Sequence, residues 1–452
     1  MLTLISGNEN ILALMYSGDD FDFKNMRRNI SERLKNFRAV INSEVAIKPS
    51  VFNYHVEAAE RILLYNTLYN AMAWFEKAEF TELYSGNIFD KDLRQKFLEN
   101  GFGVAADIDE RENYCKWRAV FQKNSEHLSV NITTTLKCNA RCPYCYEHGV
   151  KHVDFDETKI DALIDFIKRH KKNSPVKLNW FGGEPFMNPK LIDEVTRRLG
   201  ELGFQFYCYA ITNGNLLTRQ IIQTKFKQWQ IRGVQITLDG TAEQYAARKN
   251  YTGNQRDVFK KILNRISWLA ESNIHVDIRL NTDRQNLRDM LNLIYILQTR
   301  FDGEKNISYY PAFVTGLQDK LTEAEKINFV KEMFHAVANS DKINITNRFR
   351  SFPRNIPCMR NDPQSFSVDV YGRIYTCEHL VGRAEKSIGT VKRLPQKINE
   401  ARLEENLREE CQNCVFLPKC MGGCASNLET GDGACLIEKY LIQAYMQYMC
   451  ER

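Results

Sequence analysis

Three cysteines within eight residues constrain this chain more than any other feature of its sequence. They are Cys138, Cys142 and Cys145, and they follow an apolar, β-branched run at residues 128–135 that is typical of a strand. Three thiolates on one short loop can hold three corners of a cubane iron–sulfur cluster and leave its fourth iron without a protein ligand. Structural zinc, which usually takes four protein ligands, and buried cysteines without metal are the alternatives. The spacing favours an iron–sulfur cluster.

The three-cysteine loop resembles the signature of the radical S-adenosylmethionine (SAM) enzymes. In that family the open iron of the cluster binds the amino and carboxylate groups of the SAM methionine. The resemblance implies that Cys138, Cys142 and Cys145 hold a [4Fe-4S] cluster and that Tyr144, inside the loop, lies at the SAM site.

Length and composition are those of an ordinary globular protein. The 452 residues are enough for about three units, each with its own core, and 43% of them are hydrophobic and 26% charged. A net charge of +6 is too small an excess to predict nucleic-acid binding. No stretch resembles a signal peptide or a membrane span, so the sequence predicts a cytoplasmic protein that does not bind a membrane. In that compartment thirteen cysteines indicate metal binding or catalysis rather than disulfides.

The first 120 residues are predicted to form a separate domain. Residues 30–41 have the apolar spacing of a helix, residues 51–56 and 61–66 are typical of two paired strands, and two short helices are expected before residue 103. This small α+β pattern resembles the winged-helix-like recognition domains of peptide-modifying radical SAM enzymes, in which a leader peptide adds a strand to a sheet edge. The resemblance implies leader recognition, and a merely accessory domain is the alternative.

Strand and helix patterns alternate between residues 125 and 340. Strands are expected at residues 128–135, 176–180, 204–211, 233–238, 275–280 and 307–311. Strands that alternate with helices predict parallel βαβ units. Six units rather than eight predict an α/β fold with a partial (β/α)6 TIM-like barrel, whose active site lies at the C-terminal ends of the strands.

Polar motifs follow several of these strands. Gly182-Gly183-Glu184-Pro185 comes after the second strand, and there the glycines allow close backbone approach while the carboxylate can bind an ammonium group. Taken alone this motif would more often be a turn, but after a three-cysteine loop it resembles the radical SAM segment that binds the methionine amino group. The resemblance further implies that Thr237 and Arg248 bind the SAM carboxylate. Other candidate SAM-site residues at the strand ends are Thr212, Asn213 and Asn281, the last with a structural role as its alternative.

Residues 350–452 contain seven cysteines at highly specific intervals. Cys358 and Cys377 flank a segment with Gly372, and Cys411-x2-Cys414-x5-Cys420-x3-Cys424 and Cys435 follow. The pattern resembles the SPASM domain of radical SAM enzymes, and a zinc module is the alternative. The resemblance implies two auxiliary [4Fe-4S] clusters, a distal one on Cys411, Cys414, Cys420 and Cys435 and a proximal one on Cys358, Cys377 and Cys424. Because no further cysteine precedes Cys358 nearby, one proximal iron is left open or is bound by something other than a local cysteine.

Together the motifs predict an oxidoreductase with SAM and three [4Fe-4S] clusters. The resemblance implies that it takes electrons from a flavodoxin or ferredoxin, abstracts a hydrogen atom from a ribosomally made precursor peptide and closes a thioether or carbon–carbon crosslink. Glu378 stands where sulfatase-maturing relatives carry a catalytic acidic residue, and an ordinary loop glutamate is the alternative. Competing functions are a sulfatase-maturing formylglycine synthase, a peptide epimerase with a thiol such as Cys208 near its substrate, and a non-catalytic iron–sulfur scaffold.

Overall fold

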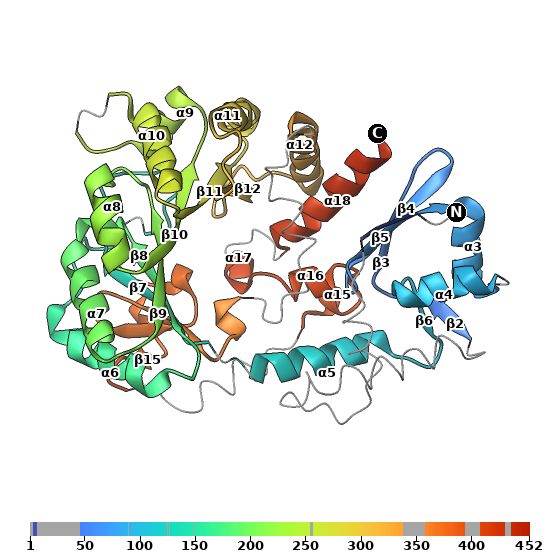
Figure 1. Cartoon of the computed structure of the whole chain (residues 1–452), viewed down its shortest axis with the longest axis horizontal. Helices are drawn as coiled ribbons and strands as arrows, with labels where there is room; N and C mark the ends of the chain where they lie inside the picture. Colours follow the sequence, from blue (N-terminus) through green and yellow to red (C-terminus); the bar gives the residue numbers. More distant parts are fainter. Residues whose placement is uncertain are drawn as a thin grey trace.

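The computed structural model describes residues 3–6, 46–88, 90–123, 125, 127–147, 149–253, 256–337, 358–393, 407–429 and 435–452. The helix expected at residues 30–41 lies outside these ranges. An α/β half-barrel forms one end of the molecule, an N-terminal sheet domain forms the other, and the helices within residues 409–450 lie between them (Figure 1). Within the described ranges no helix is long and apolar enough to cross a membrane.

Six parallel strands form the half-barrel. They are β7 (Ser129–Thr135), β8 (Val176–Gly182), β9 (Phe206–Thr212), β10 (Ile231–Leu238), β11 (His275–Thr282) and β12 (Ile307–Phe313). Neighbours in the sheet are neighbours along the chain, in the order β12-β11-β10-β9-β8-β7. The prediction of a mostly parallel α/β sheet built from six alternating strands is therefore confirmed.

Amphipathic helices cover the outer face of this sheet (Figure 1). In α6, for example, Leu163, Ile164 and Ile167 fall on one side of the helix and are buried in one cluster with Val130 and Leu178 of the strands. Short α9 was not anticipated. The helices between and after the strands are α6 (Ile160–His170), α7 (Pro189–Glu201), α8 (Arg219–Gln228), α9 (Ala242–Lys249), α10 (Val258–Glu271), α11 (Leu287–Arg300) and α12 (Glu323–Ala336).

The N-terminal domain is an antiparallel sheet of order β1-β5-β4-β3, with helices on one side. Its strands are β1 (Thr3–Ser6), β3 (Asn53–Glu57), β4 (Arg61–Asn66) and β5 (Ala71–Glu76). Both predicted strands are present, and so are the two short helices. Strand β5 was missed because its Ala-Met-Ala-Trp sequence lacks the β-branched residues typical of strands. The remaining elements of the domain are the pair β2 (Ile47–Pro49) and β6 (Gly103–Ala105), and the helices α3 (Lys77–Ser85), α4 (Lys91–Glu99) and α5 (Glu110–Lys123).

The C-terminal residues extend the barrel sheet. Strand β13 (Ser365–Val368) pairs in parallel with β7, and β14 (Arg373–Tyr375) and β15 (Gly389–Thr390) follow it in antiparallel order. Gly372, at φ 75°, makes the tight turn between β13 and β14. The later helices are α15 (Glu409–Gln412), α16 (Leu417–Cys420), α17 (Ala425–Glu429) and α18 (Ile437–Cys450).

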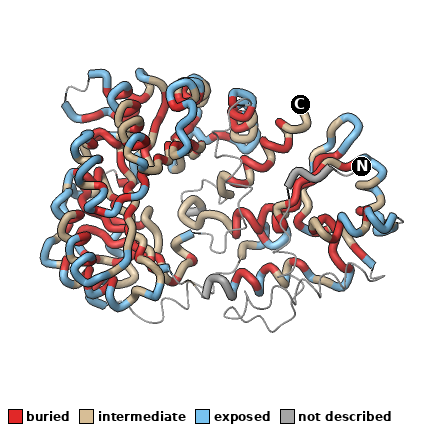
Figure 2. Tube along the Cα trace, in the orientation of Figure 1, coloured by how far each residue is buried: buried red, intermediate tan, exposed pale blue. Residues whose placement is uncertain are grey.

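Both faces of the N-terminal sheet are covered. Tyr65 and Leu63 of β4 belong to the same buried cluster as Leu441 and Tyr445 of α18. On the opposite face Phe75 packs against aromatic residues of the N-terminal domain itself. Figure 2 shows buried residues running along α18 and the N-terminal strands. The N-terminal domain therefore packs against α18 through a buried apolar face and is not joined to the rest of the chain by a linker alone.

Candidate active site

The three-cysteine loop follows β7 and is fixed by backbone hydrogen bonds to the last residue of α9 and to the residues that follow it. The N–H of Arg141 donates to the carbonyl oxygen of Lys249 over 3.0 Å, and the N–H of Thr252 donates to that of Asn139 over 2.8 Å. Two different strand-end segments therefore hold the loop between them, because the end of β8 also contacts it.

Gly182 and Gly183 allow that contact between β8 and the loop. A β-carbon at Gly182 would lie 2.2 Å from the carbonyl oxygen of Thr135, and one at Gly183 would lie 2.4 Å from that of Lys137. Gly182 also has a φ of 121°, which side chains rarely tolerate. The sequence predicts close approach by a ligand here, whereas in the structure the approaching group is the backbone of the cysteine loop. A larger residue at either position would displace the thiols.

Glu184 is fully buried beside the loop. Its carboxylate accepts hydrogen bonds from the Thr212 hydroxyl over 2.7 Å and from the Asn213 N–H over 2.8 Å. The Asn213 side-chain amide in turn lies 3.9 Å from the sulfur of Cys138. Three predicted SAM-site residues are thus brought together at one thiol. Burial raises the pKa of Glu184 to about 7, so an approaching ammonium group would favour its ionised form.

A buried polar network that sequence reasoning missed lies against Tyr144. The Tyr144 hydroxyl donates to the carboxylate of Asp239, and the Lys249 ammonium lies 3.0 Å from that carboxylate and 3.3 Å from the hydroxyl. Burial lowers the pKa of Lys249, but Asp239 and Tyr144 outweigh it and hold that pKa well above its usual range. Asp239 directly follows β10, and this position at a strand end was the available signal.

Arg248 forms a buried ion pair with Asp283, in which Nη2 and Oδ2 are 2.5 Å apart. Its guanidinium also lies 5.3 Å from the ring centre of Tyr144. The Nε of Arg248 is buried without a hydrogen-bond partner in the described part of the chain. A buried N–H of this kind normally has an acceptor. The residues present therefore fit a SAM carboxylate at Arg248 and an amino group at Glu184.

Thr237 and Asn281 lie on the adjacent strands β10 and β11. Thr237 is paired in register with Arg279, and Arg279 Nε donates to the side-chain oxygen of Asn281 over 2.9 Å. Asn281 is buried, whereas Thr237 is half-buried. Asn281 thus has a hydrogen-bond partner within the protein, and its role toward SAM stays a prediction.

Glu378 reaches the inner face of the half-barrel. Its carboxylate accepts a 2.9 Å hydrogen bond from the side-chain amide of Asn131 on β7, which itself accepts one of 2.7 Å from Asn179 on β8. Asn131 alternates with Val130 and Ile132, which pack toward the helices, so it faces the opposite side of the sheet. Glu378 is half-buried and is not a solvated loop residue.

An aromatic stack links the first cysteine loop to the segment after Cys377. The ring of Tyr146, directly after Cys145, lies parallel to the ring of Phe181 at 6.3 Å and to the ring of His379 at 4.6 Å. Tyr146 is 41% exposed although rings flank it on both sides. The stack brings residues next to two predicted cluster ligands into one row.

The seven C-terminal cysteines act on one another in two groups. Burial, followed by the charges of Glu378, Cys358 and Cys424, raises the pKa of Cys377 to about 12. Burial, Cys435, Glu438 and Cys411 likewise raise the pKa of Cys420 to about 12, and Cys414 and Cys435 contribute to a raised pKa at Cys411 after burial. These are the two ligand sets implied by the resemblance. In the part of the chain that is described, no three such side chains surround a single metal-ion position. Cluster binding therefore stays a prediction.

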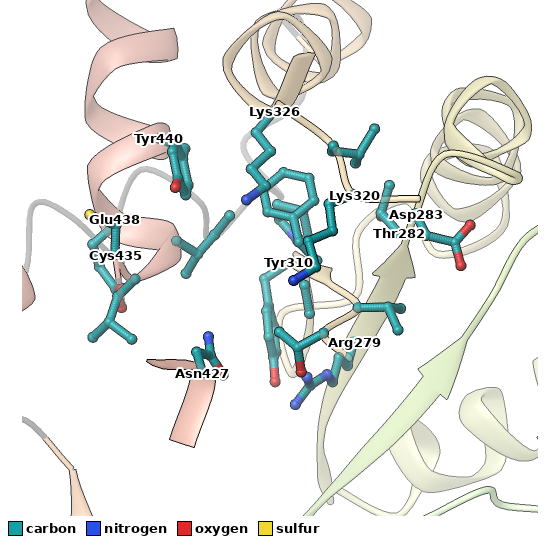
Figure 3. Close-up of a pocket in the computed structure, with 18 of the residues that line it drawn as sticks. Arg279, Thr282, Asp283, Tyr310, Lys320, Lys326, Asn427, Cys435, Glu438 and Tyr440 are labelled. Carbon is teal, nitrogen blue, oxygen red and sulfur yellow. The ribbon is translucent and has the colours of Figure 1, made fainter. Parts of the chain in front are cut away.

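A cavity of about 310 Å³ lies between the ends of β11 and β12 and the start of α18 (Figure 3). Asp283, the partner of Arg248, lines one side of it, and Cys435 lines the other. The ammonium of Lys326 lies 5.6 Å from the ring centre of Phe313 and 5.1 Å from that of Tyr440, so it bridges the two walls. Further residues that line it are Arg279, Tyr310, Lys320 and Asn427.

Comparison with known proteins identifies the barrel. The model of the radical SAM superfamily matches residues 132–294, which run from the strand before the cysteine loop to α11. The chain is a radical SAM enzyme. The predicted family is confirmed, and with it the prediction of an enzyme.

This radical SAM enzyme has relatives of known activity. It is 23% identical over 360 residues to the cysteine-type anaerobic sulfatase-maturating enzyme of Clostridium perfringens, a match that covers 69% of this chain and 92% of that relative. Across the first four curated relatives the match spans 49% to 86% of their length.

Two solved structures share the fold. One is anSMEcpe with bound AdoMet, with 18% identity, a TM-score of 0.57, and 72% of this chain and 96% of that chain covered. The other is Streptococcus suis SuiB bound to S-adenosylmethionine, with 13% identity, a TM-score of 0.50, and coverage of 84% and 96%.

Three cysteines of the radical SAM enzyme belong neither to the three-cysteine loop nor to the two C-terminal groups. Cys115 is exposed on α5 and Cys450 is half-buried at the end of α18. Cys208 on β9 is fully buried in the cluster between sheet and helices, and burial raises its pKa strongly. Cys208 is therefore not placed to donate a hydrogen atom inside the barrel, as an epimerase would require.

Proposed function

We propose that this radical SAM enzyme modifies a ribosomally made precursor peptide and closes an intramolecular thioether or carbon–carbon crosslink. The observation that carries the proposal is the cavity between β11, β12 and α18, because a peptide segment in it would pass both Asp283 beside Arg248 and Cys435. A structure of the similar protein anSMEcpe contains AdoMet and a peptide. This supports a peptide as the substrate class here.

The proposed SAM site uses the residues around the first cysteine loop. Glu184 would bind the amino group of the methionine, and Arg248 with Thr237 would bind its carboxylate, while Cys138, Cys142 and Cys145 would hold the cluster. When bound and supplied with electrons by a flavodoxin or ferredoxin, SAM and the clusters would provide two things: a 5′-deoxyadenosyl radical, which removes a hydrogen atom, and an acceptor for the electron that is released later. The contribution of the protein is to orient the substrate and to exclude water.

Glu378 is the proposed base. Closing a crosslink after hydrogen-atom abstraction releases one proton, and a carboxylate on the inner face of the barrel can accept it. Asn131 holds that carboxylate over 2.9 Å, so the oxygen has a fixed position relative to β7.

The N-terminal domain is the proposed leader-binding element. Because both faces of its sheet are covered, a leader strand has only the edges to pair with. β4 is an inner strand, so the edge expected near residues 51–66 narrows to β3, which pairs only with β4 among the described strands. A useful affinity would be about micromolar, or about −8 kcal/mol.

Hydrogen exchange tests this role without any change to the fold. Adding leader peptide to the intact enzyme should slow amide exchange in residues 53–57, the β3 strand, while exchange in β4 stays unchanged. Protection confined to other elements, or none at saturating leader, would remove the assignment of this edge.

The reaction itself is tested with a short precursor peptide, to be sought among the genes that neighbour the one for this chain. Crosslinking leaves the peptide two hydrogen atoms lighter per modification. An unchanged mass with solvent deuterium at an α-carbon would instead establish epimerisation, and absence of SAM cleavage would leave only an iron–sulfur scaffold.

Formylglycine synthesis is the second candidate. It is favoured by the match over 69% of this chain to sulfatase-maturating enzymes of two types. That reaction converts a cysteine or serine to an aldehyde, which a hydrazide label captures. Labelling of a sulfatase-derived peptide, together with an unmodified precursor, would replace crosslinking by this function.

A further inference from the structure

A second cavity, of about 100 Å³, lies where α5 of the N-terminal domain meets the C-terminal residues. Ten described residues line it, of which three are arginines and none is acidic. Arg118 comes from α5, and Arg360 and Arg408 come from the C-terminal residues, together with Cys358. Two glycines, Gly422 and Gly423, form part of the wall. A buried guanidinium N–H in such a small space is stabilised by an acceptor, and best by an anion.

The Nε of Arg118 has no acceptor in the described part of the chain. Arg118 is only 9% exposed, and this Nε is buried. Burying a guanidinium N–H without an acceptor costs free energy, and native structures rarely leave one so.

The helix holds Arg118 in place. Arg111, seven residues earlier and on the same face of α5, donates to the carbonyl oxygens of Gln412 over 2.7 Å and Asn413 over 3.1 Å. Tyr114, between them on that face, is fully buried. Arg118 thus lines the cavity from a helix that is anchored at residues 412 and 413.

Arg408 completes the positive wall. Its Nη2 donates to the carbonyl oxygen of Gly422 over 3.2 Å and lies 3.1 Å from the sulfur of Cys411. Its Nη1 pairs with Glu410, which is exposed and does not line the cavity. Its Nε, like that of Arg118, is buried without a partner in the described ranges.

We propose that this cavity binds a carboxylate group. A carboxylate offers two acceptor oxygens in the plane that a guanidinium fork recognises. The volume suits a carboxylate on a short alkyl chain, and it is well below the range of about 300–1,000 Å³ typical of pockets for larger ligands such as nucleotides.

Cys358 also lines the cavity, and this indicates what a bound carboxylate could do. Cys358 is one of only three cysteines predicted for the proximal cluster, so an anion held here would lie beside the iron that lacks a local cysteine. The carboxylate is supplied either by the peptide, as a side chain or chain end, or by a free small acid. The first source rests on the proposed function, whereas carboxylate binding by the arginines does not.

Acetate is the probe for the site. The anaerobically reconstituted full chain is titrated with sodium acetate, and saturation-transfer NMR of the acetate methyl group reports binding. Acetamide, the neutral isostere, is the ligand control. We expect saturable binding of acetate and none of acetamide, and acetate affinity at least tenfold lower for Arg118→Gln. Lys116→Gln removes the same charge from an exposed position of the same helix, 54% exposed at its side chain, and should bind acetate like wild type.

Arg118→Lys is a second variant for the case that Arg118→Gln does not fold. It keeps the buried positive charge but cannot form the two-pronged hydrogen bond of a guanidinium. Weaker acetate binding in this variant, at unchanged iron content, supports the site. Equal binding of acetate and acetamide, or wild-type affinity in both Arg118 variants, overturns it.

Two blocked tripeptides, acetyl-Gly-Glu-Gly-amide and its Gln counterpart, separate the two sources. Binding of the Glu peptide at least as tight as that of acetate assigns the carboxylate to a peptide, and binding of acetate alone assigns it to a free acid. Neither SAM nor precursor is present, so this result does not depend on the crosslinking reaction.

Discussion

The carboxylate of Glu378 accepts a 2.9 Å hydrogen bond from the side-chain amide of Asn131. Asn131 lies on β7, the strand that leads into the first cysteine loop, whereas Glu378 directly follows Cys377. The two residues are 247 positions apart, and together with the stacking of Tyr146 on His379 this contact fixes the segment after Cys377 to the barrel. The proposed base therefore takes its position from the strand that leads into the loop with Cys138.

Glu378→Gln should slow formation of modified peptide by roughly 10²–10⁴-fold, because the amide keeps an acceptor for Asn131 but cannot take a proton. Cleavage of SAM without peptide should stay near the wild-type rate, as measured by release of 5′-deoxyadenosine. Glu385→Gln, at an exposed glutamate seven residues later, is the control and should be silent. A Glu378→Gln enzyme at full rate would remove the base but leave the crosslink.

Arg248→Gln should destabilise the enzyme by about 3–5 kcal/mol, because it leaves the carboxylate of Asp283 buried and unpaired. The double variant with Asp283→Asn should regain much of that stability in thermal unfolding. If Arg248 binds the SAM carboxylate, the double variant should still fail to bind SAM in equilibrium dialysis.

Arg284→Gln provides the matched control for a charge lost at an exposed site, where Arg284 pairs with Asp319 over 2.7 Å and with Glu325, and it should change the thermal unfolding midpoint little. Wild-type SAM affinity in the double variant would show that Arg248 serves the fold alone.

Much of the barrel was accessible to sequence reasoning and much of its polar interior was not. Strands such as β10 and β11 are predictable because their Val, Ile and Leu residues are buried on a covered sheet. Asp239 and Lys249 are harder to predict as buried, because charged residues are usually solvated and only the strand-end position of Asp239 gave a signal. The two are buried because they pair with each other and with Tyr144. The contact between Glu378 and Asn131 depends on tertiary folding, which local patterns do not encode.

The stability of the N-terminal domain should fall as pH rises from about 4.5 to 7 because of Glu110. Its carboxylate is buried, accepts hydrogen bonds from Ser50 and Val51, and has a pKa raised by burial from 4.5 to about 7. Between these two values the folded chain holds a proton that the unfolded chain has released, so unfolding becomes easier as pH rises from about 4.5 to 7. The full effect is about 3 kcal/mol.

Thermal unfolding at pH 4.5 and pH 7.5, on either side of this window, measures the effect. Glu110→Gln should shrink the difference between the two midpoints, since its lost hydrogen bond costs the same at both pH values. Glu112→Gln, an exposed glutamate on the same helix, should leave the difference unchanged. An equal difference in wild type and Glu110→Gln would contradict the assignment.

Leu417→Ala should weaken the packing of the N-terminal domain against α16. Leu417 is 2% exposed and shares a buried cluster with Phe52 and with Cys411, a predicted distal ligand. The cavity should cost about 2–5 kcal/mol. Iron should then be lost to a chelator faster than in wild type, whereas Leu202→Ala, 44% exposed, should behave normally. The same docking means that deleting residues 1–120 would expose this cluster, so such a truncation would test folding as much as leader recognition.

Iron and sulfide analysis measures the cluster content itself, and ten cysteines are predicted to hold three clusters. After anaerobic reconstitution the full chain should contain about twelve irons and about twelve sulfides. Replacing Cys138, Cys142 and Cys145 together by Ala should remove about a third of the iron and abolish all SAM cleavage. A reproducible value near four irons, accompanied by bound zinc, would contradict the assignment of the two C-terminal cysteine groups.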